Sequence, residues 1–97
     1  MTEDDFHVLQ HLLKSHDLIV TNAHYDRSTF GSWEVQVTTS PPLRVLWDGK
    51  ERWLILQQES EQVFAGARVW KDLWIAEAKS QTPEAAIGAV LSRLGAA

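Results

Sequence analysis

Two strand-like runs around an Asp-Gly pair constrain the fold of this chain most strongly. Leu43–Trp47 and Arg52–Gln58 are rich in the branched and aromatic residues that favour strands, and Asp48 and Gly49 lie between them. This arrangement predicts a β-hairpin in which Gly49 has a positive φ. Both runs carry apolar residues on both faces, so we expect them at the centre of a sheet or beneath another element.

The register of this hairpin depends on the length of its turn. Trp47 pairs with Lys50 across a two-residue turn, and with Glu51 or Arg52 across a longer loop. The sequence leaves these registers open.

Further strands are expected on both sides of the hairpin. Phe30–Thr39 alternates apolar and polar residues with the period of a half-buried strand, and Ser40-Pro41-Pro42 then predicts a turn. Leu18–Tyr25 is read as a short strand or extended arm. Glu59–Gln62 is a polar break, and Val63–Ala78 after it is read as a strand, although Trp70 and Trp74 have the i,i+4 spacing of a helix.

An amphipathic helix is predicted at each end of the sequence. From Thr2 to about His16 the apolar residues fall on one side of a helix, with Thr2 as N-cap and acidic residues in the first turn. Thr82, Pro83 and Glu84 give the second helix an N-cap, an N1 proline and a first-turn acid, and Gly95 suits its C-terminal cap.

This order of elements predicts the fold class. We expect an α+β fold, an antiparallel β-meander of about four to five strands with an N-terminal and a C-terminal helix packed on one face. The 97 residues, of which 44% are hydrophobic, fit one domain spanning 1–97.

Composition excludes several classes of protein and site. The longest apolar runs are far too short to span a membrane, and the acidic start of the chain differs from a secretory signal, so we expect a cytoplasmic protein that does not bind membranes. A net charge of −4 opposes binding to nucleic acid. Without cysteine there is no disulfide, thiolate nucleophile or cysteine-based metal site.

Motifs for catalysis or cofactor binding are not recognisable. His7 and His11 share a helix face but supply at most two metal ligands, so no bound metal is expected. His24–Ser28 holds the residue types of a hydrolase triad in an expected loop, yet no nucleophile elbow accompanies them. The glycines are scattered rather than grouped in a phosphate-binding loop. We therefore expect no cofactor and no enzymatic activity, with a histidine-dependent hydrolase as one alternative.

Tryptophan is unusually frequent, because five of the nine aromatic residues are tryptophan. Trp33 and Trp47 are expected in the core. The other three are either simply large residues of the sheet or part of an exposed binding surface, since tryptophan is enriched in interface hot spots. The candidate partner-binding residues are Trp53, Trp70 and Trp74, with a charged rim of Arg44, Arg52, Asp48 and Glu51.

The back of the second helix is a further candidate surface. Ala85, Gly88, Ala89 and Ser92 occupy positions where charged residues are usual on a solvated face. This small-residue face either packs against another segment or chain, or is simply an alanine-rich exposed helix.

Three segments also carry a family resemblance. Phe30–Val35, Leu43–Leu54 and Thr82–Ile87 together resemble small uncharacterised bacterial α+β proteins, some of which look like immunity proteins of toxin systems. The resemblance implies a cytoplasmic protein that binds and blocks a partner toxin through an acidic, aromatic surface, and it implies no catalytic residues. We therefore expect a protein-binding module, with a small structural homodimer as the alternative of another class.

Overall fold

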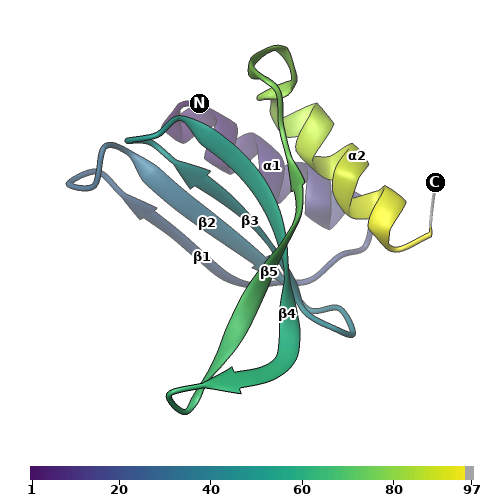
Figure 1. Ribbon diagram of the computed structural model, residues 1–97. Coiled ribbons are helices and arrows are strands. Elements are labelled where there is room, and N and C mark those ends of the chain that lie inside the picture. The colour runs from purple at the N-terminus through teal and green to yellow at the C-terminus, as the bar shows by residue number, and fades with distance from the viewer. Residues whose placement is uncertain (96–97) are drawn as a thin grey trace.

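Five antiparallel strands and two helices make up the fold of the computed structural model, which describes residues 1–95 apart from the side chains of Glu61 and Arg68. The strands lie in one sheet in the order β1-β2-β3-β4-β5, each beside its sequence neighbours (Figure 1). This confirms the predicted α+β fold with an antiparallel meander. The elements are α1 (Glu3–Ser15), β1 (Val20–Asp26), β2 (Ser32–Val37), β3 (Leu43–Asp48), β4 (Trp53–Phe64), β5 (Ala67–Ile75), a 3-10 turn η1 (Ala78–Ser80) and α2 (Pro83–Arg93).

The helices begin where their capping residues predict. Thr2 and Asp5 form a capping box at the start of α1, in which Thr2 Oγ1 accepts from the Asp5 N–H at 3.2 Å and Asp5 Oδ2 accepts from the Thr2 N–H at 2.8 Å. Thr82 caps α2 by accepting from the Ala85 N–H at 3.1 Å. Gly95 follows α2 with φ 70°, as its predicted capping role requires. Within residues 1–95, neither helix has the length and apolar character needed to cross a membrane.

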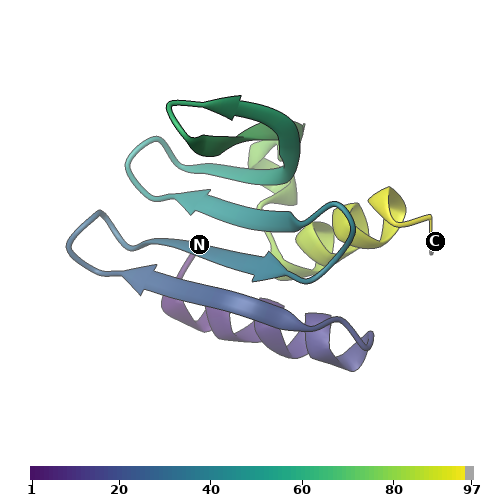
Figure 2. The same ribbon diagram turned by 90° about the horizontal axis from the view of Figure 1, so that it is seen from below.

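Both helices lie on the same face of the sheet, where they pack against each other and against the strands (Figure 2). Directly paired residues share a face of an antiparallel sheet, so the strand register builds the core in rows. One row is Trp33, Trp47 and Leu54, and both tryptophans are buried as predicted. The side chains that meet these rows from the helices are Phe6, Leu9, Leu13, Ile87 and Val90.

The β3–β4 hairpin differs from the prediction in register and in turn. Trp47 pairs with Leu54, so residues 49–52 form a four-residue loop and each of the three expected partners of Trp47 is wrong. The positive φ lies at Arg52, at 61°, and not at Gly49. Asp48 holds the loop, since its Oδ1 accepts from the N–H groups of Lys50 and Glu51 at 3.0 Å each.

Position 49 requires glycine because the backbone of the neighbouring β1–β2 loop lies very close to it. The Gly49 N–H donates to Ser32 Oγ at 2.8 Å, which ties the β3–β4 loop to the start of β2. A Cβ atom at position 49 would overlap the backbone carbonyl of Phe30. The glycine therefore lets two neighbouring hairpin loops touch.

The chain from residue 59 to residue 75 forms one long hairpin. Glu59–Gln62 was expected to break the strand, but β4 continues to Phe64 and only its register shifts there, as at a β-bulge. The reading of residues 63–78 as strand rather than helix is confirmed for most of its length. It missed the turn at Ala65 and Gly66, where φ is 54° and 81°.

Candidate functional site

Among residues 1–95, no helix covers the face of the sheet opposite α1 and α2 (Figure 2). Successive strand residues point to opposite faces, so the residues that alternate with the core rows lie here. We call this surface the open face. Its central residues are Glu34 from β2, Arg44 and Leu46 from β3, Trp53, Ile55 and Gln57 from β4, and Trp70, Asp72 and Ile75 from β5.

An apolar patch occupies one end of the open face. Leu46, Ile55 and Ile75 are paired in one row across β3, β4 and β5. Trp53 lies two residues before Ile55 on the same face and is 51% exposed. The apolar patch is defined as these four residues, of which Trp53 and Ile75 are about half exposed, Leu46 is partly buried and Ile55 is buried beneath its neighbours. Exposed apolar clusters with polar neighbours are characteristic of interaction sites on soluble proteins.

A hydrogen-bonded chain of polar side chains runs beside the patch, with one residue from each of β2, β3, β4 and β5. Arg44 Nη1 donates to Glu34 Oε2 at 3.2 Å, and Arg44 Nε donates to Gln57 Oε1 at 2.6 Å. Gln57 Nε2 then donates to Asp72 Oδ1 at 2.7 Å. We call these four residues the polar ladder. Because every link joins neighbouring strands, the ladder fixes the orientation of its side chains.

Trp70 completes the environment of Arg44. The guanidinium carbon lies 4.2 Å from the centre of the Trp70 ring, which is the geometry of a cation–π contact. Burial lowers the pKa of Arg44, while the charges of Glu34 and Asp72 raise it. The guanidinium stays cationic, since its ordinary pKa lies far above neutral. Two carboxylates against one guanidinium leave the polar ladder acidic.

A shallow hollow of about 180 Å³ adjoins Leu46 at the β1 side of the open face. Asp26 at its edge accepts from the Ser28 and Thr29 hydroxyls at 2.7 and 2.6 Å. These two hydrogen bonds hold the pKa of Asp26 below its usual range. The expected loop around His24 is partly wrong, because residues 24–26 complete β1. The lining residues are His24, Asp26, Thr29, Ser32, Trp33, Glu34 and Leu46.

The predicted partner-binding residues do not form a single surface. Trp53, Trp70 and Arg44 lie together on the open face. Asp48 pairs with Trp53 but uses its carboxylate to hold the loop, in which Glu51 and Arg52 are exposed at the end of the sheet. Trp74 is on the helix-covered side.

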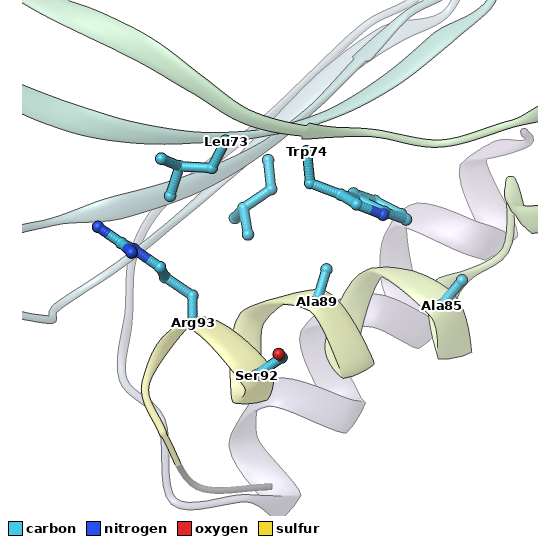
Figure 3. Close-up of a pocket in the computed structure, with 7 residues that line it drawn as sticks. Leu73, Trp74, Ala85, Ala89, Ser92 and Arg93 are labelled. Atoms are coloured by element: carbon cyan, nitrogen blue, oxygen red, sulfur yellow. The ribbon is translucent and has the colours of Figure 1, made fainter.

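Trp74 lines a groove between β5 and α2 instead (Figure 3). The groove has a volume of about 460 Å³, and the side chains of Leu73 and Trp74 extend from β5 toward α2. Ala85 and Ala89 from the small-residue face of α2 line the opposite wall, while Gly88 is exposed. We call this hollow the α2–β5 groove. Its lining residues are Leu56, Leu73, Trp74, Ala85, Ala89, Ser92 and Arg93.

The histidines considered from the sequence are exposed. His7 Nε2 lies 3.6 Å from Glu3 Oε2, and both side chains are on the outer side of α1. No group of three or more metal-ligating side chains occurs within the part of the chain that the structure describes. Among these same residues no hydrogen bond joins His24 to Ser28 or Ser32.

Three residues of the open face were missed by the sequence reasoning. Glu34, Gln57 and Asp72 lie at polar positions of their strands, where each is an ordinary surface residue until the register brings it to Arg44. Their common signal is alternation with core residues, which marks them as facing away from the helices.

Comparison with known proteins gives no relative of this chain: no family model, curated protein or solved structure matches it. The open face is therefore the feature from which a function is inferred.

Proposed function

We propose that the protein is a non-enzymatic, cytoplasmic protein-binding module and that a partner protein docks on the open face. The observation that carries this proposal is the half-exposed Trp53 in an apolar patch directly beside the polar ladder. A large aromatic anchor next to fixed polar groups is the usual composition of an interface hot spot.

The charges on the open face favour one kind of partner. Glu34 and Asp72 terminate the polar ladder, and Asp26 and Asp48 add carboxylates at the edge of the same face. Arg44 is already engaged by Glu34 and Trp70. A complementary partner surface presents apolar side chains for Trp53 and basic groups for the carboxylates.

The resemblance to immunity proteins suggests what such a partner is. An immunity protein blocks a toxin by binding it, which needs a preorganised surface and no catalytic group of its own. The polar ladder supports this form of the proposal, because its side chains are held in place before any partner arrives.

Substitution of Trp53 tests the proposal. Proteins captured by the wild type are compared with those captured by Trp53→Ala and by Ile19→Ala, a control that truncates another exposed apolar residue outside the open face. We expect one partner to be lost with Trp53→Ala only. With purified partner, calorimetry should show binding weaker by about 30- to 1,000-fold, while the melting temperature stays near that of the wild type.

Two results would count against the proposal. Equal capture by the wild type and Trp53→Ala would exclude the open face as the binding surface. Loss of binding in Ile19→Ala to the same extent would show that the effect is not specific to the patch. The immunity form of the proposal further requires that the partner alone stops cell growth and that co-expression of this protein restores it.

A further inference from the structure

Asp48 and Gly49 form the only Asp-Gly pair of the sequence, and they stand where β3 ends and its loop to β4 begins. An aspartate followed by glycine is prone to rearrange spontaneously into isoaspartate, because glycine has no side chain to hinder its backbone nitrogen and leaves the backbone free to rotate. In isoaspartate the main chain runs through the side-chain carboxyl carbon, Cγ. The pair is therefore a candidate site of covalent modification.

The rearrangement uses only the atoms of this pair and water. The Gly49 nitrogen gives its proton to solvent and attacks Cγ of the protonated Asp48 carboxyl. The new N–Cγ bond closes a succinimide ring, and the carboxyl hydroxyl leaves with a proton as water. A second water then opens the ring. Attack at Cγ restores aspartate, whereas attack at the main-chain carbonyl carbon leaves Gly49 joined to Cγ as isoaspartate, with no change in mass or oxidation state.

The folded loop holds both reacting groups in other contacts. The Gly49 N–H donates to Ser32 Oγ at 2.8 Å, and Asp48 Oδ1 accepts from the N–H groups of Lys50 and Glu51 at 3.0 Å each. Ring closure requires that the peptide between Asp48 and Gly49 turns until its nitrogen faces Cγ. That rotation takes the N–H away from Ser32, and the carboxylate must leave its two donors. Three hydrogen bonds therefore oppose the reaction.

The contact with Ser32 is the one that depends on the assembled sheet. The two bonds to Asp48 are formed within the loop itself, by residues two and three positions further on. Ser32 begins β2 and lies 17 residues from Gly49 in the sequence, so it reaches this nitrogen only when β2 and β3 are paired. The Phe30 carbonyl packs closely over Gly49 from the same side of the molecule and leaves the peptide little room to turn.

We propose that Asp48 is a site of isoaspartate formation and that the hydrogen bond from Gly49 to Ser32 keeps this reaction slow in the folded protein. The modification inserts Cβ of residue 48 into the main chain. Asp48 pairs with Trp53 across the hairpin, so the added atom alters the backbone beside a residue of the apolar patch. The chemistry itself is independent of the function proposed for the open face.

Ageing of the folded and the unfolded protein tests the proposal. Samples of the wild type, Ser32→Ala and Ser32→Thr are kept at neutral pH for several weeks, in buffer and in guanidinium chloride. Isoaspartate is then measured on digested samples with an isoaspartate-specific methyltransferase and assigned to residue 48 by peptide mapping. The wild type should react at least about 10-fold more slowly in buffer than in guanidinium chloride, because three hydrogen bonds must break first.

The two Ser32 variants isolate the hydroxyl group. Ser32→Ala should raise the rate in buffer by about 2- to 10-fold, the effect of losing one hydrogen bond. Ser32→Thr keeps a hydroxyl and should stay near the wild type. In guanidinium chloride all three proteins should react at the same rate, because Ser32 is then no longer held beside Gly49.

Two controls separate this hydrogen bond from a general loss of structure. Ser28→Ala removes another hydroxyl from the loop before β2, one that bonds to Asp26 and not to Gly49. Val90→Ala opens a cavity in the core beneath α2 and lowers the free energy of unfolding without touching the loop. Circular dichroism establishes that both are folded in buffer, and both should then react at the wild-type rate.

Any of three results would overturn the proposal. An unfolded chain that forms no isoaspartate at position 48 would show that Asp48 is not such a site. Equal rates for Ser32→Ala and the wild type in buffer would show that the hydrogen bond does not control the reaction. A rate in Val90→Ala as high as in Ser32→Ala would show that the reaction follows global unfolding instead of the contact with Ser32.

Discussion

Replacing Arg44 with methionine should measure how much the polar ladder stabilises the protein. Methionine keeps an aliphatic side chain of similar length, so the main loss is the charged donor group. Gln57 is 9% exposed, and its Oε1 would lose the donor at 2.6 Å, a loss worth about 1–3 kcal/mol. Glu34 is more exposed and can be rehydrated, so breaking its ion pair costs about 0.2–1 kcal/mol.

The contact between Arg44 and Trp70 adds a further contribution. A partly exposed cation–π pair stabilises by about 0.5–1 kcal/mol. Relief of the cost of burying a guanidinium partly offsets these losses. We therefore expect Arg44→Met to lower the free energy of unfolding by about 2–3 kcal/mol, measured by urea denaturation at neutral pH.

Two further variants separate charge from geometry. Arg44→Lys keeps the positive charge but has no planar fork to donate to Glu34 and Gln57 together, so we expect it to lose about 1–2 kcal/mol. The single variants Arg44→Met and Gln57→Leu should each lower the free energy of unfolding. The sum of these two losses should exceed the loss measured for the double variant, because the double variant leaves no amide oxygen without a donor. Arg44→Met within about 0.5 kcal/mol of the wild type would refute the ladder as a stabilising network.

Two other predictions concern a glycine and a carboxylate. Gly49→Ala should destabilise the protein by about 1–3 kcal/mol, because the new Cβ overlaps the Phe30 carbonyl. Gly88→Ala on α2, where the Cβ meets open space, should stabilise it by about 0.5–1 kcal/mol. Urea denaturation that changes the stability of both variants in the same direction would contradict this reasoning. Asp26 has a lower pKa in the folded than in the unfolded state, so its contribution is present at neutral pH and lost as pH falls through the folded pKa. Asp26→Asn should therefore be less stable than the wild type at pH 7 and approach it once the pH falls below the folded pKa of Asp26. A difference that stays constant from neutral to strongly acidic pH would show that ionisation of Asp26 does not matter.

Local signals predicted the helices and most strands. Thr2 and Thr82 mark their helices because a side-chain oxygen satisfies the free N–H groups of the first turn wherever the rest of the chain lies. The turn at Ala65 and Gly66 was missed since neighbouring polar residues, Glu59–Gln62, gave a stronger signal for a break.

The sequence predicts the apolar residues of the candidate site but not the polar ladder, because the ladder depends on the register between strands. Alternation alone places apolar residues such as Trp53 on the face away from the helices. The polar ladder depends on which residue of β4 faces Arg44, and the expected register of the hairpin was wrong. The left-handed residue of the loop is Arg52, which no sequence rule favours over Gly49.

The position of α2 beside α1 has a consequence for how the protein is made in the cell (Figure 1). Each β-hairpin joins neighbours in the sequence, so the first strands can pair before the end of the chain is available. The apolar stripe of α1 and the inner face of the sheet nevertheless lack their last cover until α2 has been synthesised. At ~5–20 residues per second the stretch after β5 takes on the order of a few seconds. During that time the chain exposes apolar surface that the finished fold buries, and such surface is what favours aggregation or chaperone binding of incomplete chains.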